Sequence, residues 1–152
     1  MSLEVGQPAP AFELPDQHGQ RVAISSFRGR MPVLLVFYPF AFSRVCTGEL
    51  RTLRDSWADL GSDHVQLLAI SCDPMFSLRA FADADGLRFP LLSDFWPHGA
   101  VSSAYGVFDS DRGCPTRSSL LIDRTGVVRW LVHNASRDAR DVAEYARVLA
   151  DL

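Results

Sequence analysis

A continuous apolar run at residues 33–38, VLLVFY, limits what this chain can fold into more than any other segment. Its β-branched and aromatic residues follow one another without a polar interruption, which is typical of a strand buried on both faces. A second run of this kind, VQLLAIS, occupies residues 65–71. Because such strands need a layer of structure on each side, the pattern favours an α/β protein with its sheet covered on both faces.

Helical periodicity separates these two strands. Between residues 43 and 60, apolar side chains recur at spacings of three and four, which predicts a helix with one stripe facing the sheet. The stripe consists of Cys46, Leu50, Leu53, Trp57 and Leu60. The remaining pattern predicts an N-terminal hairpin, two short helices, a short strand, an antiparallel strand pair and a C-terminal helix. The segments concerned are residues 12–14 with 21–24, 76–84, 90–93, 100–105, 118–123 with 127–133, and 138–152. Together these elements predict a mixed central sheet flanked by helices on both faces.

Composition is that of an ordinary globular protein. The chain has 152 residues, 47% of them hydrophobic and 22% charged, which favours a single domain over residues 1–152. The formal net charge is −3 and no block of lysine or arginine stands out, so neither nucleic acid nor a membrane surface is expected as a partner. The first 14 residues lack the basic and apolar regions of a secretion signal, and the three cysteines do not make a disulfide framework. A cytoplasmic location is therefore expected.

The segment after the first buried strand combines residues that suit a reactive thiol. Cys46 falls in the first turn of the predicted helix, where unpaired backbone N–H groups favour an anion. The thiolate is the nucleophilic form of cysteine. Ser43 suits the N-cap and adds a hydroxyl at the same end, Pro39 closes the loop, and Phe40 and Phe42 are expected to exclude water. The residue types alone leave a second interpretation open, in which Cys46 is a small buried hydrophobe and Ser43 only a cap.

This pattern resembles the peroxiredoxins, whose active-site motif Pro-x-x-x-Thr/Ser-x-x-Cys stands here as Pro39, Ser43 and Cys46. The resemblance covers nearly the whole chain. The other segments that carry it are VGQPAPAFELPDQHGQRVAISSFRGR at residues 5–30, SDFWPHGAVSSAYGVF at 93–108 and TRSSLLIDRTGVVRW at 116–130. The wording SDFWPHG and the absence of a standard resolving cysteine indicate the AhpE-like, one-cysteine subgroup. The resemblance implies a thioredoxin-like fold and a thiol-dependent peroxidase that reduces hydrogen peroxide, organic hydroperoxides or peroxynitrite.

The resemblance also implies a role for each residue of the site. Cys46 would attack the peroxide and become a sulfenic acid. Arg117 would lie beside Cys46, stabilising the thiolate and polarising the peroxide; its residue type alone suggests only a strand residue paired with a surface carboxylate. Ser43 would hydrogen-bond the peroxide, Pro39 would shield the thiol, and Glu49 would orient the arginine. Ser43 stands where the family more often has threonine, so the hydroxyl is kept but its rotamer is less stiff.

The thiol that reduces the sulfenic acid is not fixed by the sequence. Some peroxiredoxins carry a second cysteine five residues after the first, where this chain has Arg51, and others carry one near the C-terminus, which here has none. Cys72 follows the second buried strand and is expected to be a buried filler. Cys114 lies in a loop three residues before Arg117 and is the alternative internal resolver. An external low-molecular-weight thiol or a small redoxin is the working hypothesis.

Other functional classes fit the sequence less well. The chain has no CxxC pair for a thioredoxin-type reductase, and the Gln and Trp context of glutathione peroxidases is missing. A peroxide-sensing signalling protein with the same reactive cysteine remains an alternative. The four histidines show no metal spacing and no phosphate loop is present, so no metal or other cofactor is expected. Trp96 and Pro97 form an apolar loop in a region that borders a dimer interface in the family, so a homodimer is expected.

Overall fold

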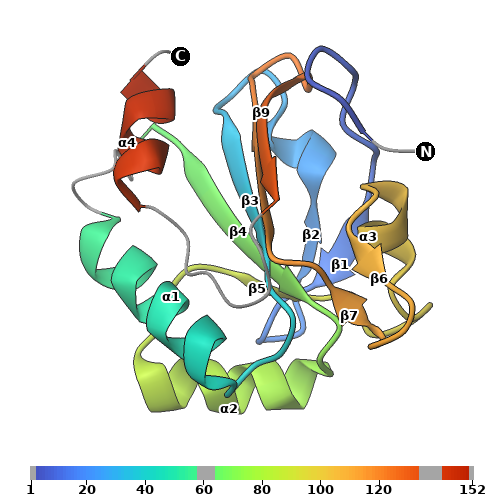
Figure 1. Cartoon of the computed structure of the whole chain (residues 1–152), viewed down its shortest axis with the longest axis vertical. Coiled ribbons are helices and arrows are strands. Elements are labelled where there is room, and N and C mark those ends of the chain that lie inside the picture. Colours follow the sequence, from blue (N-terminus) through green and yellow to red (C-terminus); the bar gives the residue numbers. More distant parts are fainter. Residues whose placement is uncertain (1–2, 58–63, 134–141, 151–152) are drawn as a thin grey trace.

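The fold is built around a five-stranded sheet in the order β5-β4-β3-β8-β9 (Figure 1). The computed structural model describes residues 3–57, 64–133 and 142–150. Three strands run parallel, namely β3 (Val33–Phe37), β4 (Gln66–Ser71) and β5 (Leu91–Ser93). Strand β8 (Ser118–Ile122) pairs antiparallel with β3 and with β9 (Val128–His133). The predicted mixed sheet and its antiparallel strand pair are therefore confirmed.

Helices cover one face of this sheet, and a mixture of elements covers the other (Figure 1). The first face carries α1 (Arg44–Ser56), α2 (Met75–Asp85) and α4 (Val142–Ala150). The second carries the 3-10 helix η1 (Ile24–Phe27), α3 (Ala100–Ala104) and the hairpin of β1 (Glu13–Pro15) and β2 (Arg21–Ala23). None of the helices in the described part of the chain has the length and apolar character that a membrane span requires.

A second hairpin, of β6 (Phe108–Asp109) and β7 (Cys114–Pro115), was not predicted. Each of its strands has two residues, which is too short for an alternating pattern to show. The other predicted segments differ from the observed elements by a residue or two at their ends, except that the helix predicted over residues 43–60 is observed over Arg44–Ser56, with residues 58–63 outside the described part. The predicted C-terminal helix is described over Val142–Ala150, and its other residues lie outside the described part.

Strand β3 is buried on both faces, as predicted. Leu34 and Val36 enter the hydrophobic cluster beneath α1 and α2, and Leu35 and Phe37 enter the cluster on the opposite face. All four side chains are at most 1% exposed. Successive side chains of a strand point to opposite faces, so alternate residues stabilise the two core layers in turn. Burial of each side chain contributes about 1.5–3 kcal/mol to stability.

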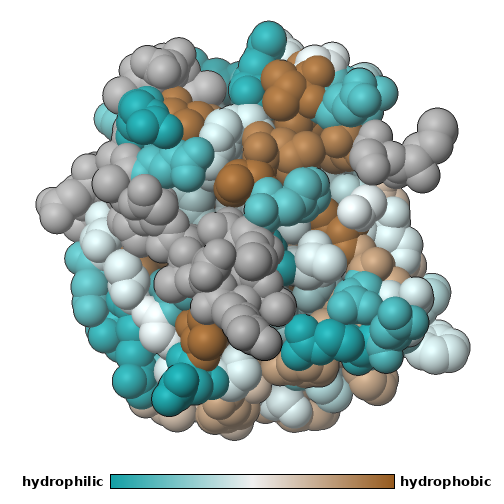
Figure 2. All heavy atoms as spheres, in the orientation of Figure 1, coloured by the Kyte–Doolittle hydropathy of each residue, from teal (hydrophilic) through white to brown (hydrophobic). Residues whose placement is uncertain are grey.

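Helix α1 shows the predicted stripe. Cys46, Leu50 and Leu53 are buried against the sheet, and Trp57 packs against the same cluster while remaining partly exposed. The predicted last member of the stripe, Leu60, lies outside the described residues. Figure 2 shows hydrophilic residues along the left side of the molecule, where α1 lies, as an amphipathic helix on the surface requires.

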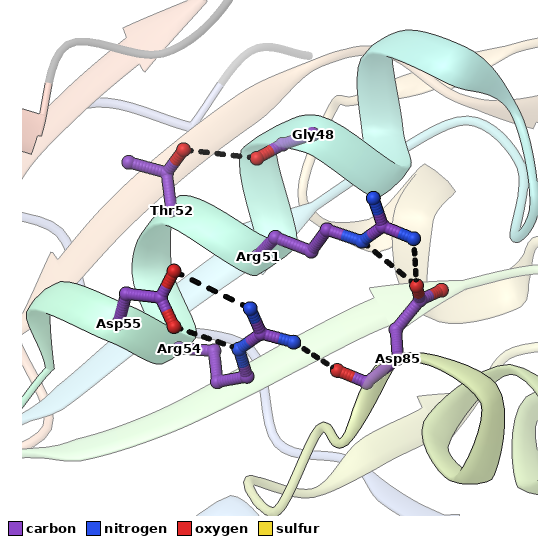
Figure 3. A network of polar contacts seen from close by, with 6 residues as sticks. All are labelled: Gly48, Arg51, Thr52, Arg54, Asp55 and Asp85. Atoms are coloured by element: carbon purple, nitrogen blue, oxygen red, sulfur yellow. Dashed lines mark hydrogen bonds and ion pairs between the residues drawn. The ribbon is translucent and has the colours of Figure 1, made fainter.

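Two arginines attach α1 to the end of α2 (Figure 3). Arg51 Nε donates to Asp85 Oδ1 at 2.8 Å, and Arg51 Nη2 donates to the same oxygen. Arg54 Nη1 donates to the Asp85 carbonyl oxygen. The Asp85 carboxylate is 6% exposed. At position 51, where some peroxiredoxins carry a second cysteine, this chain therefore has a contact between two helices.

The Asp123 carboxylate accepts the hydrogen bonds that stabilise the turn between β8 and β9. Its Oδ1 accepts hydrogen bonds from the N–H and the hydroxyl of Thr125 and from the N–H of Val127. Its Oδ2 accepts one from Arg129 Nε. Burial acts to raise the pKa of Asp123, but these hydrogen bonds outweigh burial and hold the pKa at about 2.

Candidate active site

The register between β3 and β8 brings Arg117 to Cys46. The two strands are antiparallel, and Phe37 at the end of β3 pairs with Ser118 at the start of β8. The residue before Ser118 therefore lies beside the loop that leaves β3 and enters α1. Cys46 sits in the first turn of α1, so a residue 71 positions away in sequence meets it here.

Arg117 contacts both the cysteine and a carboxylate. Its Nη1 and Nη2 lie 3.8 and 3.7 Å from the Cys46 sulfur. Nη1 also donates to Glu49 Oε1 at 3.0 Å. Cys46 is fully buried, and Arg117 and Glu49 are 4% and 5% exposed. The structure thus brings together three of the five predicted site residues, and the interpretation of Arg117 as partner of a surface carboxylate is wrong, because Glu49 is buried.

This arrangement places a positively charged group against the sulfur. A guanidinium held within 4 Å stabilises a thiolate relative to a thiol. Glu49 sits on the same face of α1, about one turn after Cys46, and accepts a hydrogen bond from the guanidinium, which fixes its orientation. The Arg117 Nε atom is buried and has no hydrogen-bond partner among the described residues.

Ser43 and Pro39 lie in the segment that joins β3 to α1, before Cys46. Ser43 occupies the N-cap of α1, and its carbonyl accepts from Thr47 N–H at 2.8 Å. Its hydroxyl makes no capping hydrogen bond, so the interpretation of Ser43 as only a cap is not supported. Pro39 is buried between β3 and this loop.

The two phenylalanines of the loop do not enclose the thiol as predicted. Phe40 and Phe42 are 38% and 55% exposed. The Phe40 ring lies beneath the Arg112 guanidinium at 5.6 Å, and Phe42 packs on Phe81 of α2 with ring centroids 5.1 Å apart. Cys46 is instead covered by the hydrophobic cluster between α1, α2 and the sheet.

Asp73 was not singled out in the sequence. Its carboxylate accepts a hydrogen bond from the Ala41 N–H, inside the loop that leads to Cys46. A signal was present, because Asp73 follows β4 at its carboxyl end. In α/β sheets, site residues gather at the carboxyl ends of neighbouring strands.

The other two cysteines are buried and unpaired with each other or with Cys46. Burial, assisted by the nearby Asp94 carboxylate, raises the pKa of Cys72 to about 12. Burial also raises the pKa of Cys114 above its usual range. Both groups are therefore protonated near neutral pH and are poor nucleophiles in this conformation.

Comparison with known proteins supplies the family context. Residues 5–131 match the family model described as AhpC/TSA family. The chain is 44% identical over 150 residues to the alkyl hydroperoxide reductase E of Mycobacterium tuberculosis, covering 99% of this chain and 98% of that protein. Its structure is similar to Enterococcus faecalis AhpC, with a TM-score of 0.88, 27% identity, and coverage of 99% of this chain and 92% of that one. The M. tuberculosis peroxidoxin BcpB gives a TM-score of 0.87, 29% identity, and coverage of 99% and 98%. These matches favour an enzyme over the peroxide-sensing alternative and confirm the predicted thioredoxin-like fold.

Proposed function

Because the chain belongs to the AhpC/TSA family and is a peroxiredoxin, an antioxidant thiol-dependent peroxidase, we propose that Cys46 is the cysteine that attacks the peroxide. The observation that carries this assignment is the contact between the Cys46 sulfur and both terminal nitrogens of Arg117. Among the described residues, Cys46 is the one cysteine with a cation held at hydrogen-bonding distance by a buried carboxylate.

The first step is a displacement at oxygen. The Cys46 thiolate attacks the terminal oxygen of the peroxide, an S–O bond forms, and the O–O bond breaks. The leaving hydroxide or alkoxide takes up a proton, whereas peroxynitrite releases nitrite, and Cys46 is left as a sulfenic acid. Negative charge moves from sulfur to the leaving oxygen, so donors fixed along that line lower the barrier. Arg117 supplies such donors, and we assign a further one to the Ser43 hydroxyl.

Two neighbours complete the proposed site. Glu49 fixes the Arg117 guanidinium so that little reorganisation accompanies the charge movement. Pro39 has no N–H to compete for the peroxide and shields the thiol from the side of β3. The roles of these residues predict a strong dependence of the oxidation rate on Arg117 and a weaker one on Ser43.

The second step needs an external thiol or a small redoxin. The attacking thiol displaces the sulfenic oxygen as water and forms a mixed disulfide with Cys46, which another thiol then reduces. The buried positions and raised pKa values of Cys72 and Cys114 support an external reductant over an internal one. Peroxide-treated protein is expected to contain no Cys46–Cys114 disulfide, as mass spectrometry would reveal.

Stopped-flow oxidation of the reduced protein tests the assignment. Hydrogen peroxide, an organic hydroperoxide and peroxynitrite are used as substrates, because these are the peroxide classes that the proposed site would take. Cys46→Ser is expected to abolish peroxide consumption, Arg117→Ala to slow it by orders of magnitude, and Ser43→Ala to slow it less. Cys72→Ser is the matched control and is expected to oxidise at the parental rate. Full activity in Cys46→Ser would overturn the assignment.

The organisation of the protein is also part of the proposal. We propose a homodimer, supported by the exposed aromatic loop in which Trp96 and Phe95 are 80% and 46% exposed. One thioredoxin-like domain over residues 1–152 is supported by the family match to residues 5–131 and by two core clusters that share one sheet. The three free cysteines are compatible with a cytoplasmic location, which we also propose.

A further inference from the structure

The loop between β3 and the cysteine helix is attached to a neighbouring strand by Asp73. Its Oδ2 accepts a hydrogen bond from the backbone N–H of Ala41 at 2.8 Å, across 32 positions in sequence. The same oxygen accepts one from the Ser71 hydroxyl at 2.7 Å. We propose that Asp73 is a positioning residue for the peroxidase reaction, holding this loop in the conformation that places Ser43 and Cys46 for attack. The inference rests on the proposed role of Cys46.

Asp73 is itself held by the central sheet. Its N–H donates to the Ser71 hydroxyl oxygen at 3.3 Å, and its carbonyl accepts from the Ser93 hydroxyl at 2.6 Å. Ser71 ends β4 and Ser93 ends β5, and both are buried. Because two adjacent parallel strands fix the backbone of Asp73, its carboxylate holds the loop at a fixed position relative to the sheet.

The hydrogen bond to Ala41 lies where the chain turns from the sheet toward α1. Tyr38 N–H makes the preceding bond to the sheet, with the Ile70 carbonyl at 3.0 Å. Pro39 follows and has no N–H to donate. The bond from Ala41 to Asp73 is thus the next backbone contact that ties the loop to the end of β4. A carboxylate acceptor makes it stronger than a bond between two neutral groups.

The residue after Ala41 is in a conformation that needs support. Phe42 has a φ of 67°, in the left-handed region, which is strained for a residue with a Cβ. Such a conformation persists only where the surroundings hold it. The Asp73 bond fixes the chain just before Phe42, and the Phe42 ring packs on Phe81. If the bond to Asp73 is removed, the loop can relax and carry Ser43 and the first turn of α1 with it.

Electrostatics predicts an effect of the opposite sign, which makes the two explanations separable. Removing a carboxylate near a thiolate favours the thiolate and would leave the oxidation rate of Cys46 equal or higher. Loss of positioning lowers the rate, since a displacement of about 1 Å can cost on the order of 100-fold. Slower oxidation after loss of the Asp73 carboxylate would therefore indicate a displaced loop and not the loss of a charge.

Three variants at this position and one control separate acceptor from charge. Asp73→Ala removes the acceptor, Asp73→Asn keeps an acceptor oxygen without the charge, and Asp73→Glu keeps the charge but displaces the acceptor. Asp83→Ala removes an exposed carboxylate from α2 and serves as the matched control. The second-order rate constant for oxidation by hydrogen peroxide is measured by stopped flow, and folding is verified by circular dichroism.

The oxidation rate constant is expected to fall by about 10- to 100-fold in Asp73→Ala and to fall in Asp73→Glu. It is expected to recover most of its value in Asp73→Asn and to stay unchanged in Asp83→Ala. Alkylation of Cys46 by iodoacetamide, measured across pH by mass spectrometry, is expected not to fall below that of the parent in any variant, because loss of a carboxylate does not disfavour the thiolate. Alkylation requires the thiolate but no peroxide held by Ser43. A general loss of structure would therefore change both alkylation and oxidation, whereas lost positioning would slow oxidation alone.

Three results would overturn the inference. They are a parental oxidation rate in Asp73→Ala, an Asp73→Asn variant as slow as Asp73→Ala, or alkylation that falls in parallel with oxidation. Cys46→Ser in the same assay keeps the two proposals apart. An inactive Cys46→Ser with an unaffected Asp73→Ala would refute the positioning role alone, whereas an active Cys46→Ser would refute the assignment of the attacking cysteine.

Discussion

Removal of the Glu49 charge is the perturbation for which the structure gives the clearest magnitude. The ion pair between Glu49 and Arg117 has an N–O distance of 3.0 Å, and its side chains are 2% and 4% exposed. Removing one partner of a buried pair leaves the other charge uncompensated, which costs about 3–5 kcal/mol. For a chain of this length, that loss lowers the Tm by roughly 6 to 20 °C. Glu49→Ala is expected to show the full loss, and Glu49→Gln a smaller one because its amide oxygen still accepts a hydrogen bond.

The same substitution is expected to slow peroxide oxidation, because the Arg117 guanidinium loses the carboxylate that fixes it beside Cys46. Urea-induced unfolding measures the stability term, and stopped-flow oxidation measures the kinetic one. Glu13→Gln is the matched control, since Glu13 pairs with Arg21 at 3.3 Å on the surface, with side chains 54% and 59% exposed. Such pairs contribute at most about 1 kcal/mol. Equal unfolding midpoints for the Glu49 and Glu13 variants would refute the reasoning from burial.

The structure supports three further predictions. Asp123→Asn is expected to destabilise the protein at pH 7. The contribution of Asp123 to the free energy of unfolding is complete above its unfolded pKa of 3.8, and it is lost as pH falls toward the folded pKa of about 2. Urea unfolding at a series of pH values checks this, and a stability difference that persists at pH 2 would contradict it. Cys72 is expected to resist iodoacetamide at pH 8 in the folded protein while Cys46 reacts, because burial raises the pKa of Cys72 to about 12; peptide mapping that finds Cys72 labelled first would be the opposing result. Asp85→Asn is expected to cost about 1 kcal/mol in urea unfolding, since Arg51 is 54% exposed and solvent screens the pair. A loss of several kcal/mol would show that the contact between α1 and α2 is stronger than its exposure indicates.

Sequence patterns fixed the elements whose burial is repetitive. The run at residues 33–38 predicted β3 because a strand covered on both faces has no solvent-facing positions to interrupt it. The stripe through Leu50 and Leu53 predicted which face of α1 meets the sheet, because helical periodicity is set by the backbone alone. The short β6–β7 hairpin was not predicted, because strands of two residues are too short to show an alternating apolar pattern.

The chemistry of the site divides in the same way. From the sequence alone, Cys46 at the start of a helix was a plausible thiolate, since helix termini are local in sequence, and resemblance to a family supplied Arg117 and Glu49. Only the tertiary structure decided that Arg117 meets Cys46, through an antiparallel register between strands far apart in the chain. It also decided that Asp73 holds Ala41, a bond between the ends of two neighbouring strands. No spacing rule predicts contacts of this kind, because they depend on which strands pair and in which register, and that is settled by the packing of the whole sheet.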